Sequence, residues 1–518
     1  MNVKLIETNI LLMSKYISNN KQIAKNTLFL YIRMFLTMTV SLYTVRIVVK
    51  TLTVQDYGLY GAVGGVILSF GLITGVLTNA SQRFFSVEIG KGEDGRVPET
   101  FSTLFFTYIG VASLVVLLAE TVGLWFLRTH MIIPDDRMSA AVWVYQFGLF
   151  SFIITLLTNP FNALIIAHEK MNVYAYISIL DVILKLLIVY ILVILEYDKL
   201  KMYALLMFCS QCVVNSVYIG YCRYKYHKDT RLLLSKDKHM YKSIFSYSSW
   251  TLFGTIAGMF NTQGMNILLN VFFGPLANAA YSIASQVYHT VSLFATNFYT
   301  AVKPALMKNY ASANFDYVQK LFLFSSKAIF ILLSVIILPL IVCTNQILLI
   351  WLGEVGEYMV AFVRLSLIYT LILTISYPIT AVVQAGGFVK LYHGIVDGFS
   401  IIALPVVFIL FKMGFQAYWA YLTSIIVFFI AHILRVYILK KVFDIFRVRE
   451  YVLCFGLPTL LIVIGSVTMM LYLKSFFDES LISTLLVCFT SSFTLTLISY
   501  FVLLSSHERE MVKKIFNK

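Results

Sequence analysis

The sequence predicts an all-α, polytopic membrane protein with about fourteen transmembrane helices. Of its 518 residues, 59% are hydrophobic and only 13% are charged, whereas soluble domains carry about 25% charged residues. Apolar runs of roughly 20 residues, the length that a helix needs to cross a bilayer core of about 30 Å, recur along the chain. A chain of this composition has too little polar surface to cover a globule in water, so most of it is expected in lipid.

The apolar runs divide the chain into fourteen predicted spans. Gly386-Gly387 is used as the break within the longest apolar stretch, because adjacent glycines interrupt a helix. The predicted spans are residues 27–50, 57–81, 101–126, 139–166, 173–195, 202–222, 244–272, 277–301, 320–343, 358–385, 388–411, 416–438, 451–473 and 481–504.

Lysine and arginine are distributed unevenly between the two sides of the predicted membrane. With the N-terminus inside, the inner loops and tails contain 27 of the 40 Lys and Arg residues, the outer loops contain seven, and six lie within spans. Cytoplasmic loops are enriched in these residues, so this bias places both termini in the cytoplasm. An even number of spans also requires that the two termini lie on the same side of the membrane.

An internal repeat is visible at an offset of 218 residues. Its matched pairs are Thr44 and Thr262, Thr78-Asn79 and Thr296-Asn297, Pro160 and Pro378, and Tyr174 and Tyr392. Because each half contains an even number of spans, the halves have the same orientation and are parallel repeats related by an axis along the membrane normal.

The repeat defines the predicted organisation of the chain. Two six-helix halves are followed by two additional C-terminal helices outside the repeat. The predicted parts are a cytoplasmic N-terminal segment (1–25), an N-terminal half (26–222), a basic cytoplasmic linker (223–243), a C-terminal half (244–438), a second basic linker (439–450), the two additional helices (451–504) and a cytoplasmic tail (505–518).

Charged side chains within the spans are expected to face a cavity or a partner, because a charge at mid-bilayer costs about 2.5–3.5 kcal/mol. Asp181 and Lys185 are four residues apart with the acid first, the favoured order for a helical ion pair. Neutralisation of Asp181 by Lys185 and an ion-coupling role for Asp181 remain alternatives. The full set is Arg33, Arg46, Glu120, Asp181, Lys185, Lys327, Arg364, Asp397 and Arg435.

Polar residues also form stripes at helical spacing. Arg33 begins a stripe on the first span, followed by Thr37, Ser41 and Thr44. The seventh and eighth spans carry a second stripe that includes Thr262, Asn266, Asn270, Gln286 and His289. Close helix packing through small and hydroxyl residues is one interpretation. The other is a wet, central cleft lined by two hairpins that the repeat relates, spans 1–2 and spans 7–8.

The sequence carries no arrangement typical of an enzyme or a nucleic-acid-binding protein. The Cys209–Cys212 spacing lies in an apolar span without a second pair or a nearby histidine, so no metal site is expected. No Walker loop and no HxxxH pair is present. The net charge of +15 comes from short loops rather than from a basic domain, which argues against a nucleic-acid partner. No cofactor is expected.

Two segments resemble a known family. Arg46 with the following Asp56-Tyr57-Gly58-Leu59-Tyr60 resembles the first hairpin of Wzx-type polysaccharide (O-antigen) flippases, and residues 80–86 (Ala-Ser-Gln-Arg-Phe-Phe-Ser) resemble the inner end of their second span. With the six-plus-six-plus-two pattern, the chain resembles the multidrug/oligosaccharidyl-lipid/polysaccharide (MOP) exporter superfamily over about residues 22–505.

The resemblance implies flipping of an undecaprenyl-pyrophosphate-linked oligosaccharide across the cytoplasmic (inner) membrane for O-antigen, capsule or exopolysaccharide synthesis. Its implied partners are the lipid-linked oligosaccharide, membrane lipids, a polysaccharide polymerase and glycosyltransferases. Arg33, Arg83 and Lys303 are then the pyrophosphate-binding candidates, and the polar stripe on the seventh and eighth spans contacts sugar. The alternative is a cation-coupled multidrug or metabolite antiporter of the same superfamily, for which Asp181 and Asp397 are the ion-coupling candidates. A peptidoglycan-precursor flippase is a third option.

Overall fold

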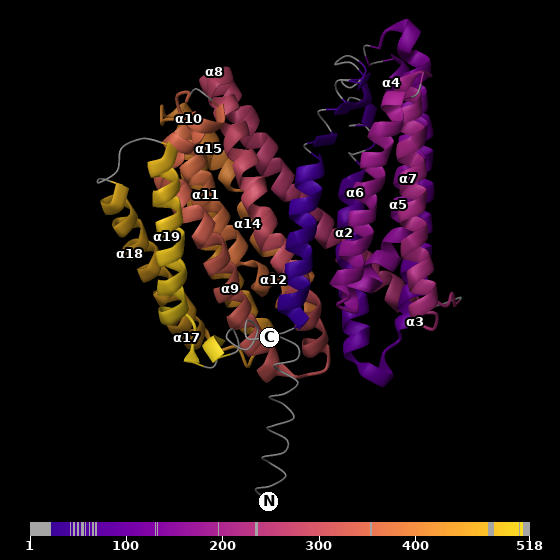
Figure 1. Ribbon diagram of the computed structural model, residues 1–518. Coiled ribbons are helices and arrows are strands. Elements are labelled where there is room, and N and C mark those ends of the chain that lie inside the picture. The colour runs from indigo at the N-terminus through magenta and orange to yellow at the C-terminus, as the bar shows by residue number, and fades with distance from the viewer. Residues whose placement is uncertain are drawn as a thin grey trace, which may run out of the picture. The chain divides into compact units, whose positions relative to one another are not determined.

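The structure is a computed structural model of the 518-residue chain. Within the residues that it describes, the regular structure consists of helices without a β-strand, which confirms the predicted all-α class (Figure 1). Arg46, Tyr57 and Gly58 of the hairpin motif lie outside the described residues. The described residues are 22–41, 43–44, 47–48, 51–52, 56, 59–61, 63–64, 67, 70–129, 131, 133–194, 196–233, 237–352, 355–474, 481–506 and 508–510.

Ten helices in this described part of the chain are long and apolar enough to cross a membrane, which makes this a multi-pass membrane protein. Each corresponds to one predicted span, and the ends differ by at most five residues. The observed helices are residues 97–129, 135–167, 171–194, 199–225, 315–342, 359–385, 389–412, 419–442, 448–470 and 482–502. Of the other four predicted spans, the first two include residues outside the described ranges, and the last two form the more polar helix α8.

The chain divides into two compact units, called here the N-terminal unit (Lys25–Leu252) and the C-terminal unit (Met1–Ala24 with Phe253–Lys518). The boundary between the units, after Leu252, lies inside α8, which begins at Lys238. In the N-terminal unit, α5 packs against α2, α3 and α7. Its helices are residues 25–41, α2 (Gly71–Gly90), α3 (Val97–Leu118), α4 (Leu124–Thr129), α5 (Met138–Ala167), α6 (Met171–Ile194), α7 (Lys199–Lys225) and the start of α8 (Lys238–Ala311).

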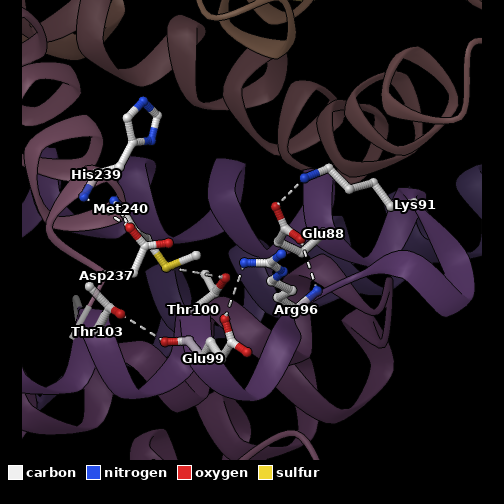
Figure 2. A network of polar contacts seen from close by, with 9 residues as sticks. All are labelled: Glu88, Lys91, Arg96, Glu99, Thr100, Thr103, Asp237, His239 and Met240. Carbon is white, nitrogen blue, oxygen red and sulfur yellow. Dashed lines mark hydrogen bonds and ion pairs between the residues drawn. The ribbon is translucent and has the colours of Figure 1, made fainter. Parts of the chain in front are cut away.

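A polar network links the end of α2, the start of α3 and the start of α8 (Figure 2). The Glu88 carboxylate at the end of α2 accepts a hydrogen bond from the backbone N–H of Arg96 at 2.9 Å, which fixes the turn into α3. Asp237 caps α8 by accepting from the backbone N–H of Met240 at 3.2 Å, and Thr100 on α3 donates to the Met240 sulfur at 3.8 Å. These contacts fasten the first turn of α8 to α3, and they explain why helix starts within the predicted basic linker.

The C-terminal unit is built around α9, which packs against α11, α18 and α19. The predicted break at Gly386-Gly387 is confirmed, because Gly387 follows α12 with φ 81°. Gly274 interrupts α8 with φ 76°, between the seventh and eighth predicted spans. Positive φ is a conformation that glycine adopts readily. The remaining helices are α9 (Phe315–Val342), α10 (Thr344–Leu352), α11 (Met359–Ile375), α12 (Tyr377–Ala385), α13 (Val389–Tyr392), the π-helix His393–Asp397, α14 (Gly398–Ser400), α15 (Ala403–Lys412), α16 (Trp419–Val442), α17 (Val448–Tyr451), the π-helix Val452–Gly456, α18 (Leu457–Lys474) and α19 (Leu481–Val502).

The two helices outside the repeat, α18 and α19, lie beside α9 (yellow in Figure 1). The chain that follows α19 is joined to α9 by a buried ion pair, in which Lys327 Nζ lies 2.8 Å from Glu508 Oε2. The same carboxylate oxygen accepts from the backbone N–H of Ser505 at 2.7 Å. This pair anchors the end of the last helix to the core of the C-terminal unit.

Candidate functional site

A cavity of about 460 Å³ lies in the N-terminal unit. Its walls include all three hydroxyl residues of the predicted first-span stripe, Thr37, Ser41 and Thr44, together with the predicted ion pair Asp181 and Lys185 from α6. The structure therefore brings together two features that are 137 or more residues apart in the sequence. Met38, Val40 and Val182 complete the lining.

The acid in this cavity is already paired. Lys185 Nζ donates to Asp181 Oδ2 at 2.7 Å, and Gln211 Nε2 donates to the other carboxylate oxygen at 3.3 Å. The spacing correctly predicted the ion pair. With these partners, the Asp181 carboxylate contributes little net negative charge to the cavity.

Arg33 lies one helical turn before Thr37. Its guanidinium carbon is 4.6 Å from the centre of the Tyr174 ring, within the range of a cation–π contact. Its Nε atom is buried and has no hydrogen-bond partner, and no ion pair joins Arg33 to an acid among the described residues. An arginine that is stabilised only by an aromatic face keeps most of its donors available to an anion.

A larger cavity, of about 590 Å³, lies in the C-terminal unit and is called here the C-terminal cavity. Parts of α8, α11, α16 and the π-helix His393–Asp397 line it. Its walls are mainly aromatic, hydroxyl and amide groups, with a few charged or titratable side chains. These residues include Asn261, Thr262, Gln263, Tyr281, Ser285, Tyr288, His289, Tyr369, Asp397, Ser400, Tyr421, Ser424, Phe428 and Arg435.

The charged residues of the C-terminal cavity differ in their pairing. Asp397 Oδ2 lies 2.5 Å from His393 Nδ1, across one turn of the π-helix. Arg435 Nε donates to the Tyr392 hydroxyl at 3.0 Å, and this hydroxyl is 2.7 Å from Thr380 Oγ1. Arg435 is only 3% exposed, and its Nη1 atom has no hydrogen-bond partner. The aspartate is therefore paired, whereas the arginine has an unused donor.

The other predicted site residues are dispersed. Gln286 lines a separate apolar cavity of about 250 Å³, and Asn266 and Asn270 line none of these three cavities. Arg83 lies over the ring of Tyr247, 5.1 Å from its centre, in the N-terminal unit. Lys303 is 3% exposed, on α8 in the C-terminal unit.

Sequence reasoning missed most of the C-terminal cavity, although a signal was present. Tyr421, Ser424, Phe428 and Arg435 follow one another on α16 at spacings of three, four and seven residues, which places them on one helix face. The spacing of polar and aromatic residues on one face, rather than polarity alone, would have identified Arg435 as a site residue.

The motif residue Asp56 belongs to a separate cluster before α5. Arg137 Nη2 lies 2.6 Å from Asp56 and its Nη1 lies 3.2 Å from Asp198, so one guanidinium bridges two acids. Burial raises the pKa of Asp56, an effect that the charge of Arg137 opposes. This cluster connects the loop of the hairpin motif to the starts of α5 and α7, which indicates a structural role.

Comparisons with known proteins agree with the sequence resemblance. The family described as "Polysaccharide biosynthesis protein" matches residues 23–310. Solved structures share the fold. One is described as "Crystal structure of MATE in the straight conformation", with a TM-score of 0.68, 14% identity, and coverage of 82% of this chain and 97% of that one. Another is the outward-facing conformation of a multidrug resistance MATE family transporter of the MOP superfamily, with a TM-score of 0.64, 14% identity, and coverage of 81% of this chain and 96% of that one.

A third structure is described by a reversed polarity of its binding pocket. It is a MOP superfamily transporter from Pyrococcus furiosus, with a TM-score of 0.63, 14% identity, and coverage of 81% of this chain and 96% of that one. No curated protein matches the chain. At these identities, the structural likeness establishes the fold that this chain shares with MOP-superfamily transporters.

Proposed function

Because this chain belongs to the polysaccharide biosynthesis protein family, we propose that it is a flippase for undecaprenyl-pyrophosphate-linked oligosaccharide. It would move the polar head group across the cytoplasmic membrane during O-antigen, capsule or exopolysaccharide synthesis. Such a head group is anionic, rich in hydroxyl groups and too polar to cross a bilayer unaided.

One observation supports this proposal above the others. Each unit of the membrane-embedded chain contains a polar cavity. Each unit also contains an arginine, Arg33 or Arg435, that has no acidic partner among the described residues. An ionisable residue inside a membrane protein is costly, so it usually serves a ligand or an ion. Guanidinium groups suit an anionic head group, because they bind phosphate or carboxylate with two parallel hydrogen bonds.

The proposed roles follow from residue chemistry. Arg33, Arg83 and Lys303 bind the pyrophosphate. The hydroxyl and amide side chains of the two cavities, among them Thr37 and Thr262, bind the glycan. The lipid tail stays in the bilayer. A polymerase and glycosyltransferases act before or after this transport step.

The antiporter alternative requires an acid that can bind a cation. Both acids proposed for that role already have partners, since Asp181 pairs with Lys185 and Asp397 with His393. Exchanging such a partner for a substrate cation would break a short hydrogen bond in each case. The pairing of both acids, together with the unpaired arginines, favours an anionic substrate.

The test is transport by the purified protein in proteoliposomes. Undecaprenyl-pyrophosphate-linked oligosaccharide is placed in both leaflets, and a glycosidase outside the vesicles measures how much glycan it can reach. We expect glycan from the inner leaflet to become accessible in protein-containing vesicles and not in protein-free ones. If only the outer-leaflet fraction is cleaved while the same vesicles exchange cationic dyes for protons or Na⁺, the antiporter is correct instead.

The proposed orientation, with both termini in the cytoplasm, has its own test. In a cysteine-free background, His227→Cys in the basic linker and Lys199→Cys in a predicted outer loop are labelled in intact cells with a membrane-impermeant maleimide. We expect labelling of the Lys199→Cys variant alone, because the loops richest in Lys and Arg remain inside. Labelling of His227→Cys alone would invert the orientation.

A further inference from the structure

The C-terminal cavity contains a cation that the proposed pyrophosphate site does not use. Arg435 is only 3% exposed, yet it lines the cavity. Its Nε is fixed by the Tyr392 hydroxyl, its guanidinium carbon is 5.7 Å from the centre of the Phe428 ring, and its Nη1 has no partner. A buried charge with an unused donor is unfavourable in the empty protein, so it indicates a site that an anion completes.

The walls around Arg435 have the chemistry of a carbohydrate site. Aromatic rings line the cavity in contact with one another: Tyr288 and Tyr369 have centres 5.7 Å apart, and Tyr369 and Phe428 have centres 4.9 Å apart. Such rings offer flat apolar faces to the C–H faces of a sugar, while tyrosine also offers a hydroxyl. Asn261, Gln263 and Ser285 add further donors and acceptors, and about 590 Å³ falls within the usual range of small-ligand sites.

The charge of the cavity limits the anion that it can hold. Arg435 and Asp397 are the cavity-lining residues of unit charge, and Asp397 is bonded to His393 at 2.5 Å. One free guanidinium neutralises one negative charge. A pyrophosphate carries more than one negative charge and would also face the Asp397 carboxylate, whereas a carboxylate matches a single planar guanidinium in charge and geometry.

We propose that the C-terminal cavity binds an acidic sugar of the transported glycan, with Arg435 binding the sugar carboxylate. The inference rests on the proposed function, because it identifies a chemical class of substrate for that transport. It assigns the two anions to different cations: the pyrophosphate to Arg33, Arg83 and Lys303, and a uronic acid to Arg435. Tyr392 positions the guanidinium through its hydroxyl.

The test compares two probes that differ only at the carboxylate. One is a uronic acid-containing tetrasaccharide, and the other is the same tetrasaccharide after reduction of its carboxyl groups to alcohols. Binding to the purified full-length protein is measured by calorimetry. We expect the acidic probe to bind roughly tenfold or more tightly than the reduced probe, and Arg435→Gln to remove that difference, since charge-assisted hydrogen bonds are lost. Arg435→Lys should retain part of it.

The matched control is Arg364→Gln. Arg364 is another arginine within a predicted span of the same unit, but its Nε donates to the backbone carbonyl of Ile341 at 3.0 Å and it does not line the cavity. This variant should keep the full preference for the acidic probe. If Arg435→Gln does not fold, the comparison of the two probes on the unchanged protein and on Arg435→Lys still decides the question.

Three results would overturn the inference: equal binding of the two probes, no binding of the acidic probe, or a preference for it that survives in Arg435→Gln. Inorganic pyrophosphate is the third probe. Should it bind with a dependence on Arg435 while the acidic sugar does not, the cavity is a diphosphate site instead. A failure of lipid-linked oligosaccharide flipping with intact carboxylate-dependent binding would reject the proposed function and leave the cavity's ligand class standing.

Discussion

Replacement of Arg33 by alanine separates substrate binding from folding. In the folded protein Arg33 makes a cation–π contact with Tyr174 at 4.6 Å, worth about 0.5–2 kcal/mol. Its buried, unpartnered Nε costs a comparable amount, about 1–3 kcal/mol. Because these two terms oppose each other, Arg33→Ala should change the stability and the membrane level of the protein little.

The expected effect on transport is much larger. Two charge-assisted hydrogen bonds from a guanidinium to a pyrophosphate contribute about 1.5–3 kcal/mol each, and about 1.4 kcal/mol corresponds to a factor of ten. Arg33→Ala should therefore reduce transport per molecule by roughly two to four orders of magnitude when substrate is below saturation. Arg33→Lys should retain part of the activity, since it keeps the charge but loses the planar pair of donors.

The assay is surface glycan display in cells, normalised to the amount of protein in the membrane, and repeated as glycan accessibility in proteoliposomes. Arg128→Ala, which removes an exposed arginine on α4, is the matched control and should transport normally. Normal transport per molecule by Arg33→Ala would remove Arg33 from the substrate site. A fall in protein level with normal transport per molecule would show that Arg33 is structural.

Two further predictions concern the C-terminal unit. Lys327→Met should lower stability in detergent by about 3–5 kcal/mol, because it leaves the Glu508 carboxylate buried without its partner; the double variant with Glu508→Leu should recover most of this loss, and an equal loss in both variants would contradict the reasoning. Gly254→Ala should lower the melting temperature and oligosaccharide binding, because its methyl group would meet the Asp397 carboxylate, whereas Gly258→Ala, with no atom within 4 Å of the added carbon, should leave the melting temperature unchanged.

The fold was predictable from sequence because membrane solvation is a simple constraint. A helix that crosses lipid needs a long apolar run, and ten such runs were found within a few residues of their observed ends. The ends themselves depend on local contacts that composition does not show. For example, α8 starts at Lys238 under the Asp237 cap, six residues before the apolar run that predicted it.

The site was predictable only in part, because helix spacing defines a face but not what that face meets. Thr37, Ser41 and Thr44 were correctly placed on one face, and the structure adds that the ion pair of α6 lies opposite them. Arg435 was recognised as a charge within a span, yet its role depends on the tyrosines of α8 and α11 that pack around the same cavity. Those residues are between 66 and 154 positions away along the chain.

The two halves of the internal repeat share cavity-lining and tyrosine–arginine contacts, but their arginines lie at different positions. Thr44 and its repeat partner Thr262 each line the cavity of their own unit. The repeat-related tyrosines each contact a buried or half-buried arginine, since Tyr174 lies under Arg33 and Tyr392 accepts from Arg435.

The arginines themselves are not repeat partners. Arg33 comes from the first predicted span of its half, whereas Arg435 comes from α16, the sixth span of the other half. The two halves therefore share a tyrosine that contacts a guanidinium, whereas the arginine that carries the guanidinium lies on a different helix in each half. Two cation sites built separately on equivalent positions need not recognise the same anion. This asymmetry is the reason to expect that Arg33 binds the pyrophosphate shared by all lipid-linked substrates, and that Arg435 binds a charge that belongs to the glycan.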